Sequence, residues 1–198
     1  MNIIELIKLK LDTLLENNYQ GYENQIDNNI KHLITNSLLE LNDDKILVSG
    51  KIGIRTFEDI EIKYENKLYK IDINTHNTDK VISLPSLLSI KRAKDFLSDY
   101  NNFIVYIFVD YKFINNEMYI VKISVQNIES LDWSYLSIQN LGKGQLQMKN
   151  ITELIFNNNI TRREWLSILK QKGSDYYNNL LLKITEYKTI WDDERLDN

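Results

Sequence analysis

Apolar residues recur at helical spacing in three parts of this 198-residue chain. The first part predicts a helix over residues 3–16, with one apolar side made by Ile3, Ile4, Ile7, Leu11, Leu14 and Leu15. The second predicts a helix from about Tyr22 to Leu41, with an apolar side made by Ile26, Ile30, Leu33, Ile34, Leu38 and Leu41. The third begins after Thr161, which forms a capping box with Glu164, and its apolar side holds Trp165, Leu166, Leu169, Tyr176, Leu180 and Ile184.

Between these helices, alternation of apolar and polar positions predicts strands. Residues 59–74 contain two of them, DIEIKY and KLYKIDI, joined around Glu65-Asn66. Residues 103–113 and 118–125 form a second hairpin around residues 115–117. Other strands are expected at residues 46–53, 133–139 and 144–148, and Pro85 is expected in the first turn of a helix over residues 85–98. The order of elements predicts an α/β sandwich around a mixed sheet, in a single domain of residues 1–198.

The composition is that of an ordinary globular protein, with 43% hydrophobic and 26% charged residues. No apolar run approaches the roughly 18–20 residues that a membrane span requires, so no membrane association is expected. The N-terminal segment mixes charged residues into its apolar positions, which is typical of an amphipathic helix and not of a signal peptide. The chain has no cysteine, which excludes disulfides, thiolate chemistry and zinc knuckles, and a cytoplasmic location is expected.

The net charge of −4 argues weakly against nucleic-acid binding, because DNA-binding proteins usually carry a basic surface. The charges are unevenly distributed, however. Basic residues gather in residues 91–94, 143–149 and 162–172. A metal-dependent nuclease can be acidic overall when its cleft becomes basic once the cation is bound.

Two acids of the first hairpin form the strongest candidate site. Asp59 starts the first strand, and Asp72 lies near the end of the second, so antiparallel pairing would bring the two carboxylates side by side. Two converging carboxylates make a hard-oxygen site that suits Mg²⁺.

The residues around these acids resemble a known family. Asp59-Ile-Glu-Ile, followed by Tyr69-Lys-Ile-Asp72-Ile-Asn74-Thr75-His76-Asn77, is similar to the metal-site hairpin of type II restriction endonucleases of the PD-(D/E)xK superfamily, in the branch of HincII, EcoRV and SwaI. Three further blocks resemble that group in the same order: residues 84–89 (LPSLLS), 145–147 (QLQ) and 161–165 (TRREW). The resemblance covers residues from about 55 to 185.

This resemblance implies a restriction-endonuclease-like mixed β-sheet core flanked by helices. It also implies Mg²⁺-dependent hydrolysis of phosphodiester bonds in a short palindromic site of double-stranded DNA, by a homodimer that leaves blunt ends. A cognate DNA methyltransferase of a restriction-modification system would accompany it. Asp59 and Asp72 would be metal ligands, with the Ile73 carbonyl as a third. Glu23 would be an auxiliary acid, or else a favourable charge at a helix N-terminus.

The sequence departs from the family pattern at Asn74, where the motif has lysine. Asn74 can hold a water molecule by hydrogen bonds, but it brings no positive charge and cannot shuttle a proton. Related nucleases with Glu or Gln at this place are active. By strand alternation Lys70 shares a face with Asp72 and is either a substitute for the missing lysine or a solvated strand residue. His76 is either a general base or a loop residue that contacts phosphate or solvent.

Two segments are candidates for reading DNA bases: the polar loop, with Thr75, Asn77, Ser83 and Ser86, and the strand that carries Gln145, Gln147 and Lys149. Phosphate contacts would come from the basic residues and from the start of the last helix, namely Lys91, Arg92, Thr161, Arg162 and Arg163. Alternatively, residues 162–172 form the solvated face of an amphipathic helix. The three tryptophans, Trp133, Trp165 and Trp191, are expected in the core.

Three hypotheses follow. The first is a homodimeric type II restriction endonuclease that pairs through its first two helices, whose apolar faces exceed what a small sheet can cover. The second is a nuclease-fold protein that binds its DNA site without cutting it, because of Asn74. The third is an unrelated α/β interaction protein in which the hairpin acids have no catalytic role.

Overall fold

The computed structural model describes residues 2–15, 18–20, 25–50, 58–80, 85–139, 144–149, 156–157 and 159–193. Within these residues the elements are α1 (Ile3–Asp12), β1 (Asn18–Gln20), α2 (Ile26–Leu39), β2 (Ile46–Gly50), β3 (Ile60–Tyr64), β4 (Lys67–Asn77), β5 (Ser86–Ser89), α3 (Ile90–Leu97), β6 (Asn102–Ile114), β7 (Glu117–Asn127), the 3₁₀ helices η2 (Ile128–Ser130) and η3 (Trp133–Tyr135), β8 (Leu136–Gln139), β9 (Gln145–Met148) and α4 (Arg162–Asp193).

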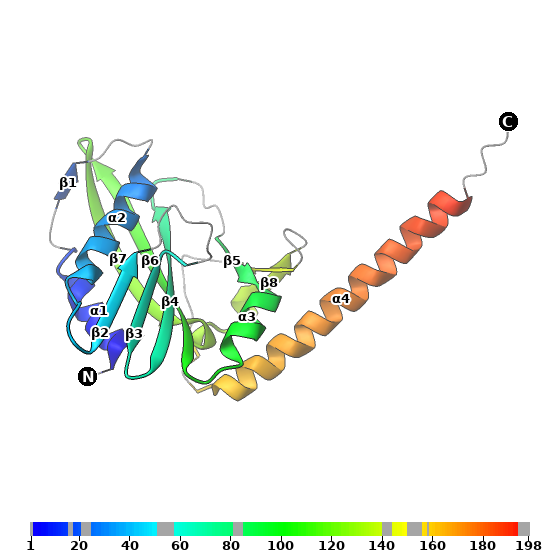
Figure 1. Ribbon diagram of the computed structural model, residues 1–198. Helices are drawn as coiled ribbons and strands as arrows, with labels where there is room; N and C mark the ends of the chain where they lie inside the picture. Colours follow the sequence, from blue (N-terminus) through cyan, green and yellow to red (C-terminus); the bar gives the residue numbers. More distant parts are fainter. Residues whose placement is uncertain are drawn as a thin grey trace.

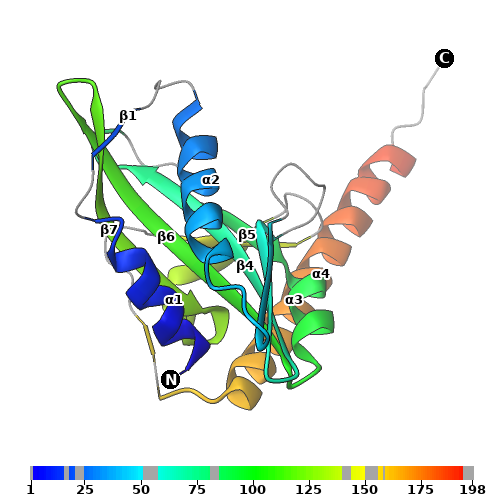
Figure 2. The ribbon, with the colours of Figure 1, turned by 60° about the vertical axis from the view of Figure 1, so that its left-hand side comes forward.

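A six-stranded sheet in the order β1-β7-β6-β4-β3-β2 forms the centre of the fold. β4 and β6 are parallel, and the other neighbouring pairs are antiparallel, so the predicted mixed sheet is confirmed. Helices α1 and α2 cover one face, while α3 and the first turns of α4 lie on the other (Figures 1 and 2). A small antiparallel sheet, β5-β9-β8, completes the second face.

Each face of the large sheet has its own core. On one face, Ile71 and Ile73 of β4 pack among the apolar sides of α1 and α2. On the other, Tyr106 of β6 packs among residues of α3, α4 and the small sheet. β6 contributes to both cores and is therefore apolar at consecutive positions, as expected for a strand that is covered on both sides.

Two tight turns explain why the predicted hairpins are confirmed. Glu65 and Asn66 both have positive φ angles, 50° and 60°, and Asn115 and Asn116 have φ angles of 53° and 67°. Two consecutive left-handed residues are the mark of a type I′ turn, whose twist matches that of the strands it joins. Asparagine tolerates this conformation better than most residues do. Both turns therefore fix the register of their strands locally.

The helix predicted over residues 85–98 is wrong in its first turn. Ser86–Ser89 is strand β5, which pairs with β9, and the Pro85 carbonyl accepts a hydrogen bond from Met148 N (3.2 Å). The helix begins at Ile90, after Ser89 caps it by accepting a hydrogen bond from Arg92 N. Pairing with a distant strand outweighs the helix-starting tendency of proline.

Two other local predictions have mixed outcomes. The capping box of the last helix is confirmed, because Glu164 accepts from Thr161 N (2.8 Å) and Thr161 Oγ1 accepts from Glu164 N (3.3 Å). The strand expected from residue 133 begins only at Leu136. Residues 133–135 form a 3₁₀ turn instead, because the Asp132 side chain accepts a hydrogen bond from Ser134 N.

The expectation that the apolar faces of α1 and α2 exceed what the sheet can cover is wrong, whereas a dimer surface on these helices stays a prediction. Their apolar sides are buried against the large sheet, which is wide enough to cover both helices. Exposed apolar side chains gather on the distal part of α4, which projects from the body (Figure 1): Tyr177, Leu181, Leu182, Ile184, Tyr187, Ile190 and Trp191. Trp191 is 75% exposed, so its expected core position is wrong, whereas Trp133 and Trp165 are buried as predicted. No helix among the described residues carries an apolar stretch that would reach across a bilayer.

Trp165 should be one of the most sensitive positions of the fold. Its side chain is fully buried, donates a hydrogen bond to the Leu131 carbonyl (3.4 Å) and packs on Trp133 with ring centroids 4.9 Å apart. We expect Trp165→Ala to lower the free energy of unfolding in urea by roughly 3–5 kcal/mol, because it leaves a large cavity. Tyr100→Ala, which removes an exposed aromatic ring, is the control. A loss for Trp165→Ala as small as that of the control would contradict this packing.

Candidate active site

The register of β3 and β4 brings Asp59 next to Asp72. Asp59 directly precedes β3, and its backbone N–H donates to the Ile71 carbonyl (2.8 Å). Asp59 Oδ2 accepts a hydrogen bond from Ile73 N (2.8 Å), and Ile73 directly follows Asp72, which carries the second carboxylate. The pairing of Ile60 with Ile71 continues this register into the hairpin. The two acids therefore converge where β3 begins, as their spacing in the sequence predicts.

The closeness of the two acids appears in the pKa of Asp72, which is raised to about 7. Burial is the main cause, and the Asp59 carboxylate adds to it because two like charges at close range disfavour each other. Lys31 and a hydrogen bond from the Asn74 amide to Asp72 Oδ2 (3.0 Å) oppose the shift. The site thus holds more negative charge than its own groups neutralise.

Lys31 is a member of this cluster that the sequence analysis missed. Its Nζ lies 2.8 Å from Oδ2 and 3.1 Å from Oδ1 of Asp59, and the two side chains are only 26% and 13% exposed. Lys31 belongs to α2, 28 residues before Asp59. In the sequence it is one polar residue beside the apolar stripe of a helix, and no local signal marks it.

Asn74 and His76 follow Asp72 on the same side of β4, because alternate residues of a strand share a face. Asn74 is committed to Asp72 by its hydrogen bond. His76 Nδ1 lies 3.1 Å from Asp110 Oδ1, while its Nε2 is buried without a partner. His76 lies four positions after Asp72, a distance of about 13 Å along β4. His76 therefore pairs with Asp110 of β6 and not with either acid of the hairpin.

Lys70 lies on the α3 side of β4, as alternation predicts, and its ammonium is 5.2 Å from the centre of the Phe96 ring. Its Nζ forms an ion pair with Glu58 at 3.0 Å. Lys31 pairs with Asp59 itself and lowers the pKa of Asp72. Lys31 is therefore more directly linked to the two hairpin acids than Lys70 is.

The donors present suit a hard divalent cation. Among the described residues no three acidic or histidine side chains gather, so any site must be completed by other oxygen atoms. The Ile73 carbonyl is one such atom. The backbone groups of Ile71 and Ile73 point toward the same edge of β4. The Ile71 carbonyl bonds to Asp59 N, so the Ile73 carbonyl points toward the Asp59 end of β3 as well. Two carboxylates and a carbonyl are the ligand types that Mg²⁺ prefers.

The candidates for base reading lie in two places. Thr75 and Asn77 are in the last part of β4, and Thr75 Oγ1 donates to Asp27 of α2. Three others lie in the small sheet: Ser86 pairs with Gln147, and Gln145 donates its amide to the Leu87 carbonyl. Lys149 donates to the Ser134 carbonyl (3.0 Å). Glu23 and Ser83 lie outside the described residues.

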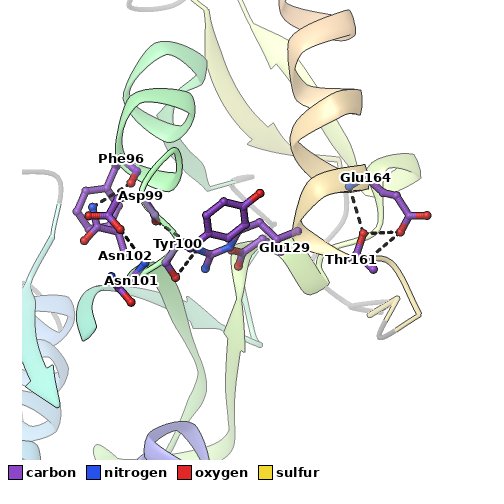
Figure 3. Close-up of polar contacts among 9 residues, drawn as sticks. Phe96, Asp99, Tyr100, Asn101, Asn102, Glu129, Thr161 and Glu164 are labelled. Atoms are coloured by element: carbon purple, nitrogen blue, oxygen red, sulfur yellow. Dashed lines mark hydrogen bonds and ion pairs between the residues drawn. The ribbon is translucent and has the colours of Figure 1, made fainter. Parts of the chain in front are cut away.

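The phosphate-binding candidates differ in how exposed they are. Arg162 bonds to Glu129 (2.7 Å) and to the carbonyls of Asp99 (3.3 Å) and Tyr100 (3.0 Å), three residues that are labelled in Figure 3. The Arg162 guanidinium also stacks over the ring of Phe103. These contacts give Arg162 a structural role in fixing the start of α4, and the Thr161 side chain is likewise used in the helix cap. Arg163 and Arg92 are exposed, and Lys91 pairs with Asp95 on the surface of α3.

A groove between α3 and α4 adds to this basic surface. Lys91, Lys94 and Lys170 line it, together with Ile90, Leu169, Gly173, Ser174 and Tyr177. It lies on the α3 side of the large sheet, the side that carries Asp72. Lys94 and Lys170 were not singled out individually in the sequence, although both fall in basic clusters that it shows.

Comparison with known proteins shows the fold of this chain. No family model matches the chain, and no curated protein sequence matches it. Among solved structures the chain is similar to the NlaIV restriction endonuclease, with a TM-score of 0.52 and 11% identity, over 85% of this chain and 78% of that one. The predicted restriction-endonuclease-like fold, a mixed sheet flanked by helices, is thereby confirmed.

The raised pKa of Asp72 predicts how stability varies with pH in the metal-free protein. The proton of Asp72 is held more tightly in the folded state than in the unfolded state, where the pKa is near 3.8. Its contribution to stability is therefore complete below pH 4 and is lost as the pH rises through 7. We expect Asp72→Asn, which stays neutral, to be more stable than the parent by roughly 2–4 kcal/mol at pH 8, and by much less at pH 4.

Urea unfolding of both proteins in the presence of a chelator, between pH 4 and pH 8, measures this difference. Asp79→Asn is the control, because Asp79 is exposed and its substitution should not change the pH dependence. Parallel stability curves for the parent and Asp72→Asn would show that Asp72 is not buried beside a second charge.

Proposed function

We propose that this chain is a Mg²⁺-dependent type II restriction endonuclease that hydrolyses phosphodiester bonds in a short palindromic site of double-stranded DNA and leaves blunt ends. The observation that carries the proposal is the convergence of Asp59 and Asp72, which raises the pKa of Asp72, in a restriction-endonuclease-like fold. Burying two acids together costs stability, and a site that binds a cation supplies a reason for it.

Asp59, Asp72 and the Ile73 carbonyl would hold the ion. When bound, Mg²⁺ would stabilise negative charge on the phosphate and lower the pKa of the attacking water. The chain itself orients the two carboxylates, through the Ile73 N–H on Asp59 and the Asn74 amide on Asp72. Asn74 would also hold water by a hydrogen bond, without adding charge.

DNA recognition would use the two polar segments near the hairpin. Gln145, Gln147 and Ser86 lie together in the small sheet, and Thr75 and Asn77 lie at the end of β4; amide and hydroxyl side chains read base edges in the major groove. Phosphates would be bound by the exposed basic residues Lys91, Arg92, Lys149 and Arg163. The basic groove between α3 and α4 extends this surface.

A homodimer would match a two-fold symmetric DNA site, and the distal part of α4 supports it. Tyr177, Leu180, Ile184, Tyr187 and Trp191 follow one another at alternating spacings of three and four. This is the repeat of a coiled-coil seam, which packs against another helix, and most of these side chains are exposed in the single chain. We infer that α4 of a second copy covers the seam.

The proposed enzyme is one endonuclease domain, since both cores share the large sheet. We place its action in the cytoplasm. A cognate DNA methyltransferase of the same restriction-modification system would protect the cell's own copies of the site.

The second candidate function is specific DNA binding without cleavage. Asn74 favours it, because the position lacks the charge that lysine provides in the family that this hairpin resembles.

Removing either carboxylate should abolish cleavage while leaving DNA binding intact. We expect Asp59→Asn and Asp72→Asn each to lower the Mg²⁺-dependent cutting of plasmid DNA by roughly 10²–10⁴-fold, because each would lose a metal-holding charge. Glu61→Gln, on the same hairpin, should cut like the parent. The ends of the products are sequenced, and specific binding is measured in Ca²⁺.

The outcomes separate the hypotheses. Metal-dependent cutting by the parent that both Asn variants lose supports the endonuclease. Specific binding without cutting supports the second candidate, and the absence of both rejects the two functions together. Overhanging ends would reject the blunt cut alone.

The α4 seam predicts the oligomeric state. We expect the parent to sediment as a dimer and the double variant Ile184→Asp/Tyr187→Asp to sediment as a monomer, because charges at seam positions cannot be buried. Thr185→Asp adds a charge beside the seam and should leave the dimer intact. A dimer that persists in the double variant would show that the interface lies elsewhere.

A further inference from the structure

The position of Lys31 is set by the packing of α2 and not by its ion pair alone. Its neighbours Ile30 and Ile34 are fully buried against the large sheet. One turn earlier, Asp27 accepts hydrogen bonds from Thr75 of β4 and from Tyr111 of β6 (3.4 Å). These bonds attach α2 to the last part of β4 and to the neighbouring strand β6. Core packing and these bonds together hold the Lys31 backbone beside the end of β3.

Lys31 is the cation that lies against this pair of acids, with Nζ 2.8 Å and 3.1 Å from the two carboxylate oxygens of Asp59. Asp59 and Asp72 carry two negative charges when both are ionised, and Lys31 balances one of them. Asp59 Oδ2 already accepts the Ile73 N–H, so Asp59 does not depend on Lys31 alone for a hydrogen bond. The Lys31 ammonium is therefore held against Asp59, one of the two acids that would hold the metal.

We propose that Lys31 is a catalytic residue of this nuclease, and that its ammonium provides the positive charge that Asn74 lacks. The inference rests on the proposed function. Lysine has a flexible four-carbon stem and three donors, so its ammonium can leave Asp59 for a phosphate oxygen without a change in α2. The cation then comes from a helix on the opposite side of β4 from Asn74.

In the reaction, Lys31 donates hydrogen bonds to a non-bridging phosphate oxygen and to the attacking water, and it keeps all three of its protons. The water oxygen forms a bond to phosphorus and releases a proton to the solvent. The bond between phosphorus and the 3′ oxygen breaks with its electron pair, and that oxygen takes a proton from solvent. Charge that develops on the phosphate in the transition state is thereby stabilised by a fixed cation.

Lys63 and Lys70, which belong to the hairpin itself, are placed differently from Lys31 of α2. Lys70 is paired with Glu58, and Lys63 is exposed beside Glu61. Lys63→Met is therefore a matched control, because it makes the same substitution on the hairpin that carries the two acids without removing a contact to either of them.

Single-turnover cleavage in Mg²⁺ tests the proposal with four proteins: the parent, Lys31→Met, Asn74→Lys and the double variant. We expect Lys31→Met to lower the rate by roughly 10²–10⁴-fold, and Lys63→Met to leave it unchanged. In the double variant Asn74→Lys should restore most of the rate, because a lysine again faces the phosphate. A restored rate also shows that the Met substitution has not unfolded the protein.

Calorimetric titration with Mn²⁺ gives a readout that does not depend on activity. Loss of Lys31 removes a cation that competes for Asp59, so Lys31→Met should bind Mn²⁺ at least as tightly as the parent. Specific DNA binding in Ca²⁺ should be unchanged. A parental cleavage rate in Lys31→Met overturns the proposal, as does a rate loss that is accompanied by weaker Mn²⁺ binding or by no rescue from Asn74→Lys.

The same proteins separate this inference from the proposed function. If the parent is inert and Asn74→Lys cuts, the fold carries nuclease chemistry but Lys31 does not supply the missing cation, and only the inference is rejected. If neither protein cuts, the proposed function fails and the catalytic role of Lys31 is rejected with it.

Discussion

The antiparallel register of β3 and β4 is the constraint on which the rest of the structure depends. The type I′ turn at Glu65-Asn66 sets this register, and the hydrogen bond from Asp59 N to the Ile71 carbonyl extends it to the residue before Ile60, the first residue of β3. A shift by one residue would turn Ile71 and Ile73 out of the core and place Asp72 in it. One local turn therefore decides both the core of the sheet and the meeting of the two acids.

The two cores serve the candidate site in different ways. The core under α1 and α2 fixes Lys31 and, through Asp27, the end of β4. The core under α3 and α4 carries the small sheet with Gln145 and Gln147, and the Arg162–Glu129 pair anchors the first turn of α4 to this side. The small sheet with Gln145 and Gln147 thus lies on the same side of the large sheet as Asp72, and core packing fixes its position relative to the candidate site.

The candidate site is the part of the molecule that stability alone does not explain. Burial and a neighbouring carboxylate raise the pKa of Asp72 well above its ordinary value, so ionising it costs the metal-free fold free energy. Elsewhere the buried acid Glu129 pairs with Arg162 at 2.7 Å, although burial still raises its pKa. Local rules of folding are commonly broken where function requires it, and Asp59 and Asp72 fit that description.

The sequence by itself determined what depends on neighbouring residues. The two hairpins, the capping box at Thr161 and the pairing of Asp59 with Asp72 all rest on alternation, turn residues and short spacing, so they could be predicted without the fold. Contacts between distant segments could not. Ser86–Ser89 form a strand because β9 pairs with them, the apolar faces of α1 and α2 are buried by the large sheet, and Arg162 is used inside the protein. Lys31 reaches Asp59 only because α2 packs beside the end of β3. The physical reason is that the role of a residue in a site depends on the charged groups that tertiary packing brings next to it. The sequence of a helix reveals which of its residues face the core, but not which distant side chains the others contact.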